Sequence, residues 1–185
     1  MLPPGHIAAG YLVAKVYETI FHPHISLIQS KQLLWLGALF GFLPDLDMFL
    51  AFFNLKSFTI QPEKADHRAY LTHIPYLWLL LGVIIWIIGK IFGSVFTSSI
   101  GIVLFLSTWS HFILDSIYFG VQWLWPFSKK CFALFNIRPG AIKSIDSSFF
   151  GYWSTFIKNY YIEQRVTAYL ELLLIALAVH AILLN

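Results

Sequence analysis

Long apolar segments constrain this chain more than any other feature of its sequence. A helix needs about 20 apolar residues to cross the roughly 30 Å hydrocarbon layer of a membrane. The chain is 58% hydrophobic and only 11% charged, which is more apolar than ordinary soluble domains. We therefore predict an all-α fold, an integral membrane bundle of four to five helices. The predicted helices cover residues 5–21, which are either amphipathic or spanning, and residues 32–53, 70–91, 97–119 and 166–184.

The chain is predicted to form one domain, because no linker, composition break or internal repeat divides it. Residues 1–185 then form a single helical membrane domain, made of a bundle (1–120), an interfacial segment (121–165) and a C-terminal helix (166–185). The interfacial segment mixes aromatic with basic residues, a composition typical of the membrane–water boundary. The N-terminus lacks a basic and apolar leader, so we expect no cleavable signal peptide. The single cysteine, Cys131, indicates little about function.

Basic residues predict the orientation of the bundle. If all five helices cross, segments 54–69 and 120–165 lie on the same side as the N-terminus. By the positive-inside rule, the side with more Lys and Arg faces the cytoplasm. The opposite side holds mainly Lys31 and Lys90, whereas this side holds Lys56, Lys64, Arg68, Lys129, Lys130, Arg138, Lys143, Lys158 and Arg165.

Four groups of acidic residues and histidines interrupt the apolar pattern, and the predicted topology places these four groups at one membrane face. His111 and Asp115 are four apart, which puts both side chains on one face of a helix. Pro44 predicts a helix break beside Asp45 and Asp47. The interruptions are PGHIAAG with His6, FLPDLDMF with Asp45 and Asp47, ADHRAYLTH with His67 and His73, and SHFILD with His111 and Asp115.

Such a cluster favours a divalent metal. Carboxylates packed together near hydrocarbon repel one another and lose hydration, and a bound cation removes both costs. Imidazole nitrogen and carboxylate oxygen are the ligands of zinc and of manganese or iron sites. We also weighed simpler interpretations of each piece. The two aspartates after Pro44 could form a turn, His67 and His73 could belong to a solvated loop, and His111 with Asp115 could be a hydrogen-bonded pair that stabilises helix packing.

Four motifs together resemble a known family. GH near the N-terminus, LPDLD, DHRAYLTH, and HFILD followed by a glycine and LWPF are similar to the membrane-bound metal-dependent hydrolases, which include the LexA-regulated inner-membrane-associated hydrolase group of bacteria. That family is distantly similar to the zinc-dependent phospholipase C and single-strand nuclease superfamily. The resemblance covers about residues 6–135. It implies a site in the bacterial inner membrane, toward the cytoplasm, with His6, Asp45, His67, His111 and Asp115 as metal ligands.

The chain departs from the family pattern at two positions. The family usually has HRG followed by THS, and this chain has Ala69 and Ile74 in place of the glycine and the serine. Ile74 removes a hydroxyl that could support the site. The N-terminal tryptophan of the distant superfamily is also not visible, so its number of metal ions does not carry over.

The resemblance implies a phosphoric-ester hydrolase in which a divalent metal, zinc with manganese, iron or magnesium as alternatives, activates water. Arg68 is expected to bind phosphoryl oxygens, because its planar guanidinium matches phosphate. Asp47 or His73 is expected to act as the general acid or base. Membrane lipids and an anionic phosphate ester are the expected partners, and no nucleic acid is expected. The residues expected to hold an anionic headgroup are Trp125, Lys129 and Lys130.

Two other classes of function remain open from the sequence. A haem or metal carrier could clamp iron between His73 and His111, although the carboxylates argue against it. A cation or proton transporter would need polar groups that continue to the other membrane face. Segments 70–91 and 97–119 are expected to be almost wholly apolar there.

Overall fold

The structure, a computed structural model, describes residues 1–46, 71–118, 120–135, 154 and 165–184. No strand occurs among these residues, and an isolated antiparallel bridge joins Val121 to Phe132. The predicted all-α fold class is therefore confirmed. The α-helices are α1 (Pro3–Phe21), α2 (Leu27–Phe42), α4 (Pro75–Ile91), α5 (Val95–Asp115) and α7 (Arg165–Leu183), and two 3₁₀ helices are η1 (Leu43–Leu46) and η3 (Leu71–His73).

Local sequence signals set the helix boundaries. α1 and α4 each begin with proline, at Pro3 and Pro75, where the missing N–H has no helical partner to lose. Ser26 caps α2 through a reciprocal pair of bonds with Gln29, and the Ser94 side chain accepts a bond at the start of α5. The predicted break at Pro44 is confirmed, because α2 ends at Phe42 and the chain continues as η1.

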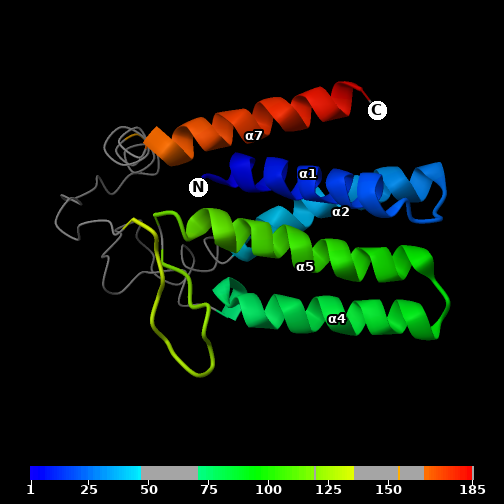
Figure 1. Cartoon of the computed structure of the whole chain (residues 1–185), viewed down its shortest axis with the longest axis horizontal. Helices are drawn as coiled ribbons and strands as arrows, with labels where there is room; N and C mark the ends of the chain where they lie inside the picture. The colour runs from blue at the N-terminus through cyan, green and yellow to red at the C-terminus, as the bar shows by residue number, and fades with distance from the viewer. Residues whose placement is uncertain (47–70, 119, 136–153, 155–164, 185) are drawn as a thin grey trace.

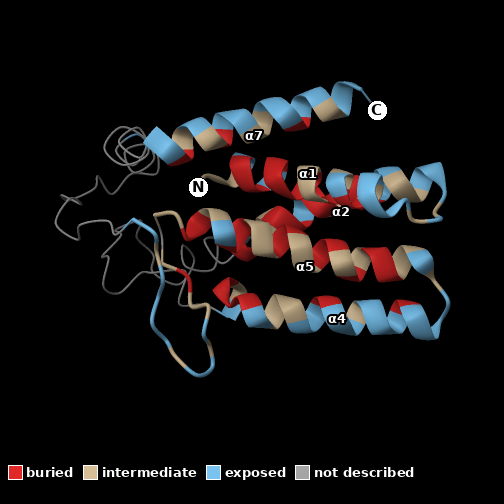
Figure 2. Cartoon of the chain, in the orientation of Figure 1, coloured by how far each residue is buried: buried red, intermediate tan, exposed pale blue. Residues whose placement is uncertain are grey.

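The helices lie side by side, and each runs opposite to the helix before it in the chain, so that the neighbours α1 and α7 run in the same direction (Figure 1). α1, α2 and α5 pack on one another in the centre, whereas α4 packs on α5 and α7 packs on α1. Figure 2 shows the same order, with most buried residues on the three central helices. The N-terminus, η1, η3 and the last turn of α5 all lie at one end of the bundle (Figure 1). This end gathers the polar interruptions of the sequence.

Three glycines bring α1 and α2 into backbone contact. A Cβ atom on Gly10 would lie 2.1 Å from the carbonyl oxygen of Gly37. A Cβ atom on Gly41 would lie 2.3 Å from the carbonyl oxygen of His6. Apolar helices usually approach this closely where small residues line the contact. The contact fixes the end of α2 against the turn of α1 that carries His6.

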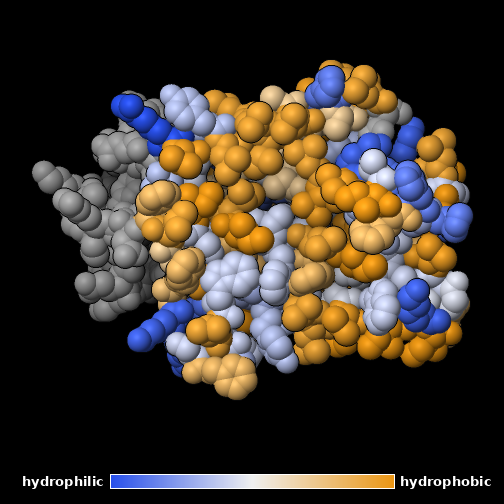
Figure 3. All heavy atoms as spheres, viewed as in Figure 1, coloured by the Kyte–Doolittle hydropathy of each residue, from blue (hydrophilic) through white to orange (hydrophobic). Residues whose placement is uncertain are grey.

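The outer helices present apolar side chains outward. Leu80, Ile84 and Ile87 of α4 are exposed, as are Leu172 and Leu173 of α7. Figure 3 shows hydrophobic residues over much of one face of the bundle. In the part of the chain that is described, two helices, α5 and α7, are long and apolar enough to cross a membrane. α4 is apolar but has 17 residues.

Candidate metal centre

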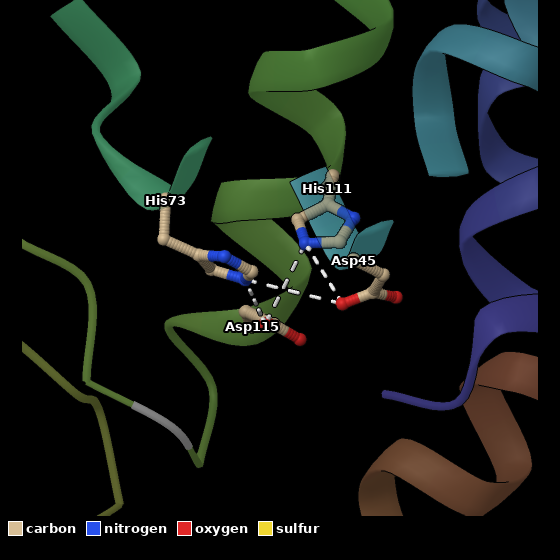
Figure 4. A group of neighbouring side chains, drawn as sticks. All are labelled: Asp45, His73, His111 and Asp115. Carbon is tan, nitrogen blue, oxygen red and sulfur yellow. Dashed lines mark ion pairs between the residues drawn. The ribbon is translucent and has the colours of Figure 1, made fainter. Parts of the chain in front are cut away.

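Four buried side chains from three elements meet at one end of the bundle (Figure 4). We call them the quartet. Each offers one nitrogen or oxygen atom, and these four atoms all lie within 4.8 Å of one another. The quartet consists of Asp45 from η1, His73 from η3, and His111 and Asp115 from α5.

The local structure of each element explains this convergence. His111 and Asp115 are one helical turn apart in the last turns of α5 and therefore share its inward face. Asp45 follows the proline that ends α2, so its carboxylate leaves the helix axis and turns toward α5. His73 ends η3 just before α4 starts at Pro75. The quartet thus depends on three helix ends meeting, not on one continuous motif.

The spacing within the quartet suits a shared cation. His111 Nε2 lies 3.7 Å from Asp45 Oδ1 and 3.7 Å from Asp115 Oδ2. His73 Nε2 lies 3.9 Å from each of the same two oxygens. These distances exceed a hydrogen bond. Donor atoms at about 2.0–2.2 Å from a tetrahedral zinc ion are separated by about 3.4 Å, so these four histidine–carboxylate distances exceed the tetrahedral spacing by a few tenths of an ångström.

A backbone carbonyl orients His111 toward the centre of the quartet. His111 Nδ1 lies 2.9 Å from the carbonyl oxygen of Gly41 and donates to it, since a carbonyl can only accept. The proton on Nδ1 leaves the lone pair of Nε2 directed into the quartet. This Nε2 atom and Asp45 Oδ2 are buried and lack a hydrogen-bond partner among the described residues. Buried polar atoms of this kind require a ligand or ion, or else they carry a desolvation cost.

His6 lies beside the quartet rather than within it. Its Nε2 donates to Asp115 Oδ1 at 3.1 Å, and the α-amino group of Met1 donates to the same oxygen at 2.9 Å. The His6 ring stacks on His111 with ring centroids 3.7 Å apart. The two hydrogen bonds, from His6 and from Met1, use Oδ1 of Asp115, whereas the two quartet histidines lie near Oδ2. His6 thus holds Asp115 and His111 in place, and the expectation that it ligates a metal stays a prediction.

The other expected site residues fall in two groups. Asp47, His67 and Arg68 lie outside the described residues, so their roles stay predictions. Trp125, half-buried, and the exposed Lys129 and Lys130 lie in the chain that follows α5. No contact joins these three side chains to the quartet among the interactions described.

The sequence left one role in the site open, and one further feature of the site was not anticipated. Asp47 or His73, whichever is free of metal, was expected to act as the acid or base, and the structure places His73 among the quartet's potential ligands. The Gly41 carbonyl was not considered, although Gly37 and Gly41 form a small-xxx-small pair on the predicted second helix. That spacing is a readable signal for a close helix crossing, and here the crossing supports His111.

Fold and site together define a class: an apolar all-helical protein with a buried histidine–carboxylate cluster at one end of its bundle. The sequence model of the YdjM inner membrane protein family matches residues 1–185. The chain therefore belongs to the YdjM inner membrane protein family. No curated protein and no solved structure matches the chain.

Proposed function

We propose that this protein is a membrane-embedded, metal-dependent hydrolase that cleaves a phosphate ester. The observation that carries the proposal is the quartet, in which two imidazoles and two carboxylates lie buried within reach of one ion. The motifs that resemble membrane-bound metal-dependent hydrolases support the same class. A divalent metal held there supplies Lewis acidity, which activates water for attack on phosphorus.

The residues around the quartet have separable roles in this proposal. His111 is held by the Gly41 carbonyl, and Asp115 is held by His6. Such supporting bonds keep ligands in a fixed tautomer and orientation. Arg68 remains the proposed partner of the phosphoryl oxygens, and Asp47 the proposed acid or base. His73 contributes Nε2 as a ligand instead of acting as acid or base.

The proposed setting is a bundle that crosses the inner membrane with the quartet at the cytoplasmic face. The family description and the apolar outer faces of α4 and α7 support the membrane location, and the excess of Lys and Arg on the quartet's side of the sequence topology supports the orientation. Because η1, η3 and the end of α5 lie at the same end of the bundle, the site would lie near that membrane surface rather than at the midplane (Figure 1).

The test is the metal content of the detergent-purified protein, measured by mass spectrometry. The variant is His111→Ala with Asp115→Ala, and the matched control is His24→Ala with His180→Ala. His24 and His180 are exposed and do not belong to the quartet. We expect one or more equivalents of zinc, manganese or iron in the parent and control, and a clear loss in the quartet variant.

Activity is tested next with a phosphatase and phospholipase substrate screen on the metal-loaded protein. Hydrolysis that disappears in the quartet variant and persists in the control supports the proposal. A parent that stays empty of metal after reconstitution contradicts it. A parent that binds metal but hydrolyses no phosphate ester would instead favour the carrier alternative.

The transporter alternative is weakened by the interior of α5. Contrary to expectation, the far half of this helix is not wholly apolar, because Ser98 and Ser99 are buried and Ser99 bonds the hydroxyl of Tyr17. Ser107 is buried near the quartet. Between Ser99 and Ser107 on α5, however, Val103 is fully buried. This apolar side chain argues against a relay of hydroxyl groups along α5.

A further inference from the structure

The chain that follows α5 forms a closed, hydrogen-bonded loop, which we call the aromatic hairpin (residues 120–135). Val121 and Phe132 exchange two backbone hydrogen bonds of 3.1 and 2.9 Å. The N–H of Leu134 bonds the carbonyl of Ser116 at 2.7 Å, and the N–H of Phe135 bonds that of Ile117 at 2.8 Å. Because both ends are tied to each other and to the residues after α5, the hairpin has a defined position.

Trp123 contacts the end of α5, the helix that carries His111 and Asp115 of the quartet. Its indole N–H donates to Ser116 Oγ at 2.8 Å. Its ring meets those of Trp109 and Phe112 edge-on, with centroids 5.4 and 6.4 Å apart. Phe112 is fully buried and is the neighbour of His111 in the sequence. The hairpin is thus built onto the same helical turns as the candidate metal centre.

The outer side of the hairpin exposes large apolar side chains beside two cations. Phe127 is 95% exposed, and Leu124 and Phe132 are 66% and 57% exposed. Lys129 and Lys130 lie between Phe127 and Phe132 in the sequence and are exposed as well. Exposing such apolar side chains to water is unfavourable. At the boundary of an anionic bilayer, the apolar tip can be buried among acyl chains and the lysines are attracted to the negative surface.

The location of the hairpin specifies the occupant further. It extends from the end of α5 along the end of the bundle, past the start of α4 (Figure 1). If the apolar helices cross the membrane, this end is level with the lipid headgroups. The two lysines then face phosphate groups, and the aromatic tip faces the upper acyl chains. An anionic lipid therefore fits both the position and the charge of this surface.

We propose that the aromatic hairpin binds anionic phospholipid and presents its headgroup to the quartet end of the bundle. The proposal rests on the proposed function and names its substrate class, an anionic glycerophospholipid. Phe127 and Leu124 enter the acyl boundary, and Lys129 and Lys130 pair with the phosphate. Trp123 holds this surface against the end of α5.

The test places a spin label at the tip of the hairpin. Phe127→Cys is made in a Cys131→Ser background, so that the label occupies one position in a chain whose single native cysteine is Cys131. Phe127 is too exposed for its replacement to remove core packing. The labelled protein is freed of bound metal with a chelator, which is then removed, and is placed in phosphatidylcholine vesicles with increasing phosphatidylglycerol. Relative access of oxygen and of a water-soluble nickel complex reports the depth of the label.

Two double variants in the same background test the lysines. Lys129→Gln with Lys130→Gln removes the pair in the hairpin, and Lys31→Gln with Lys90→Gln removes the same charge from the predicted opposite face. We expect the label to prefer oxygen, and to move deeper as phosphatidylglycerol increases. Each hairpin lysine contributes on the order of a fivefold preference for the anionic surface. The response should be lost in the hairpin variant and kept in the control.

Three results would overturn the proposal. One is a label that stays open to the nickel complex in every lipid mixture, and another is an anionic-lipid response that survives loss of the lysine pair. The third is dipolar broadening between labels, which would make a second copy of the chain the occupant. The depth of the label is measured on protein that holds no metal in the quartet and turns over no substrate. Failure here is therefore distinguishable from failure of the hydrolase proposal, which is judged by metal content and hydrolysis.

Discussion

Replacing Gly41 with alanine is expected to weaken metal binding more than it weakens the fold. The added Cβ would lie 2.3 Å from the backbone oxygen of His6, whereas ordinary contact begins at 3.4 Å. The two helices must therefore separate by about 1 Å at this point, because backbone cannot rotate away as a side chain can. Gly41 also provides the carbonyl that orients His111, so the same shift moves a quartet ligand.

The magnitudes of the two effects differ. Overpacking costs about 1–3 kcal/mol, and the better helix propensity of alanine returns about 1 kcal/mol, so the net loss of unfolding free energy is about 0–2 kcal/mol. Ligand distances in metal sites tolerate about 0.2 Å, several times less than the required shift. Loss of a supporting bond to a ligand typically costs about 10–100-fold in metal affinity. We expect zinc affinity to fall by that factor.

The assay compares zinc affinity, measured by competition with a chelating dye in detergent, with the midpoint of thermal unfolding. Gly89→Ala is the matched control. Gly89 lies at the end of α4 far from the quartet, and a Cβ atom there would lie 2.4 Å from the backbone nitrogen of Ser98 in α5. It produces a similar clash away from the quartet. The control should lose stability and keep its zinc affinity.

Retention of parental zinc affinity by Gly41→Ala, with normal unfolding, would refute the inferred link between the helix crossing and His111. Equal losses of affinity in both variants would show that the clash acts through global stability. Only a selective loss at Gly41 supports the geometry described above.

Three further predictions concern the same region. Zinc affinity should fall as the pH is lowered, because protons compete with the metal for the ligand histidines and carboxylates; an affinity independent of pH would contradict the ligand set. His6→Gln should keep zinc affinity within about tenfold of the parent, since the glutamine amide can still donate to Asp115, whereas His6→Ala should lose more affinity. Equal losses of zinc affinity in the two variants, measured by titration, would indicate that His6 is a ligand. Trp123→Phe removes the bond to Ser116, worth about 1 kcal/mol, and should speed tryptic cleavage in the hairpin about fivefold, with unchanged cleavage refuting the tie to α5.

The length of the apolar segments was sufficient to predict that five helices exist, but not all of their ends, because α2 begins at Leu27 and not at residue 32, and α4 begins at Pro75 and not at residue 70. The helix predicted at 97–119 is α5 (Val95–Asp115), and the one predicted at 166–184 is α7 (Arg165–Leu183). Pro44 predicted the end of α2, because proline interrupts the hydrogen-bond pattern of any helix that contains it. The spacing of His111 and Asp115 placed both on one helix face, as the structure shows.

The sequence could not assign roles within the cluster. His6 and His73 both lie near the start of a predicted helix, and periodicity gives the direction of a side chain but not its distance from a neighbouring helix. That distance depends on how closely α1 and α2 approach, which the glycine contact at Gly41 decides. His73 moreover lies in a 3₁₀ turn, where helical spacing does not apply. The difference between ligand and support therefore arises from tertiary packing.

The fully buried Val103, with Leu104 beside it, has a consequence for the direction of the chemistry. These side chains lie between the hydroxyls at the far end of α5 and the quartet, so apolar packing separates the polar groups of this helix. In a bundle that crosses the membrane, such packing opposes the passage of protons along α5. If the quartet is the site of the proposed hydrolase, its chemistry would be confined to the membrane face at which the quartet lies, and turnover would change the lipid composition of one leaflet.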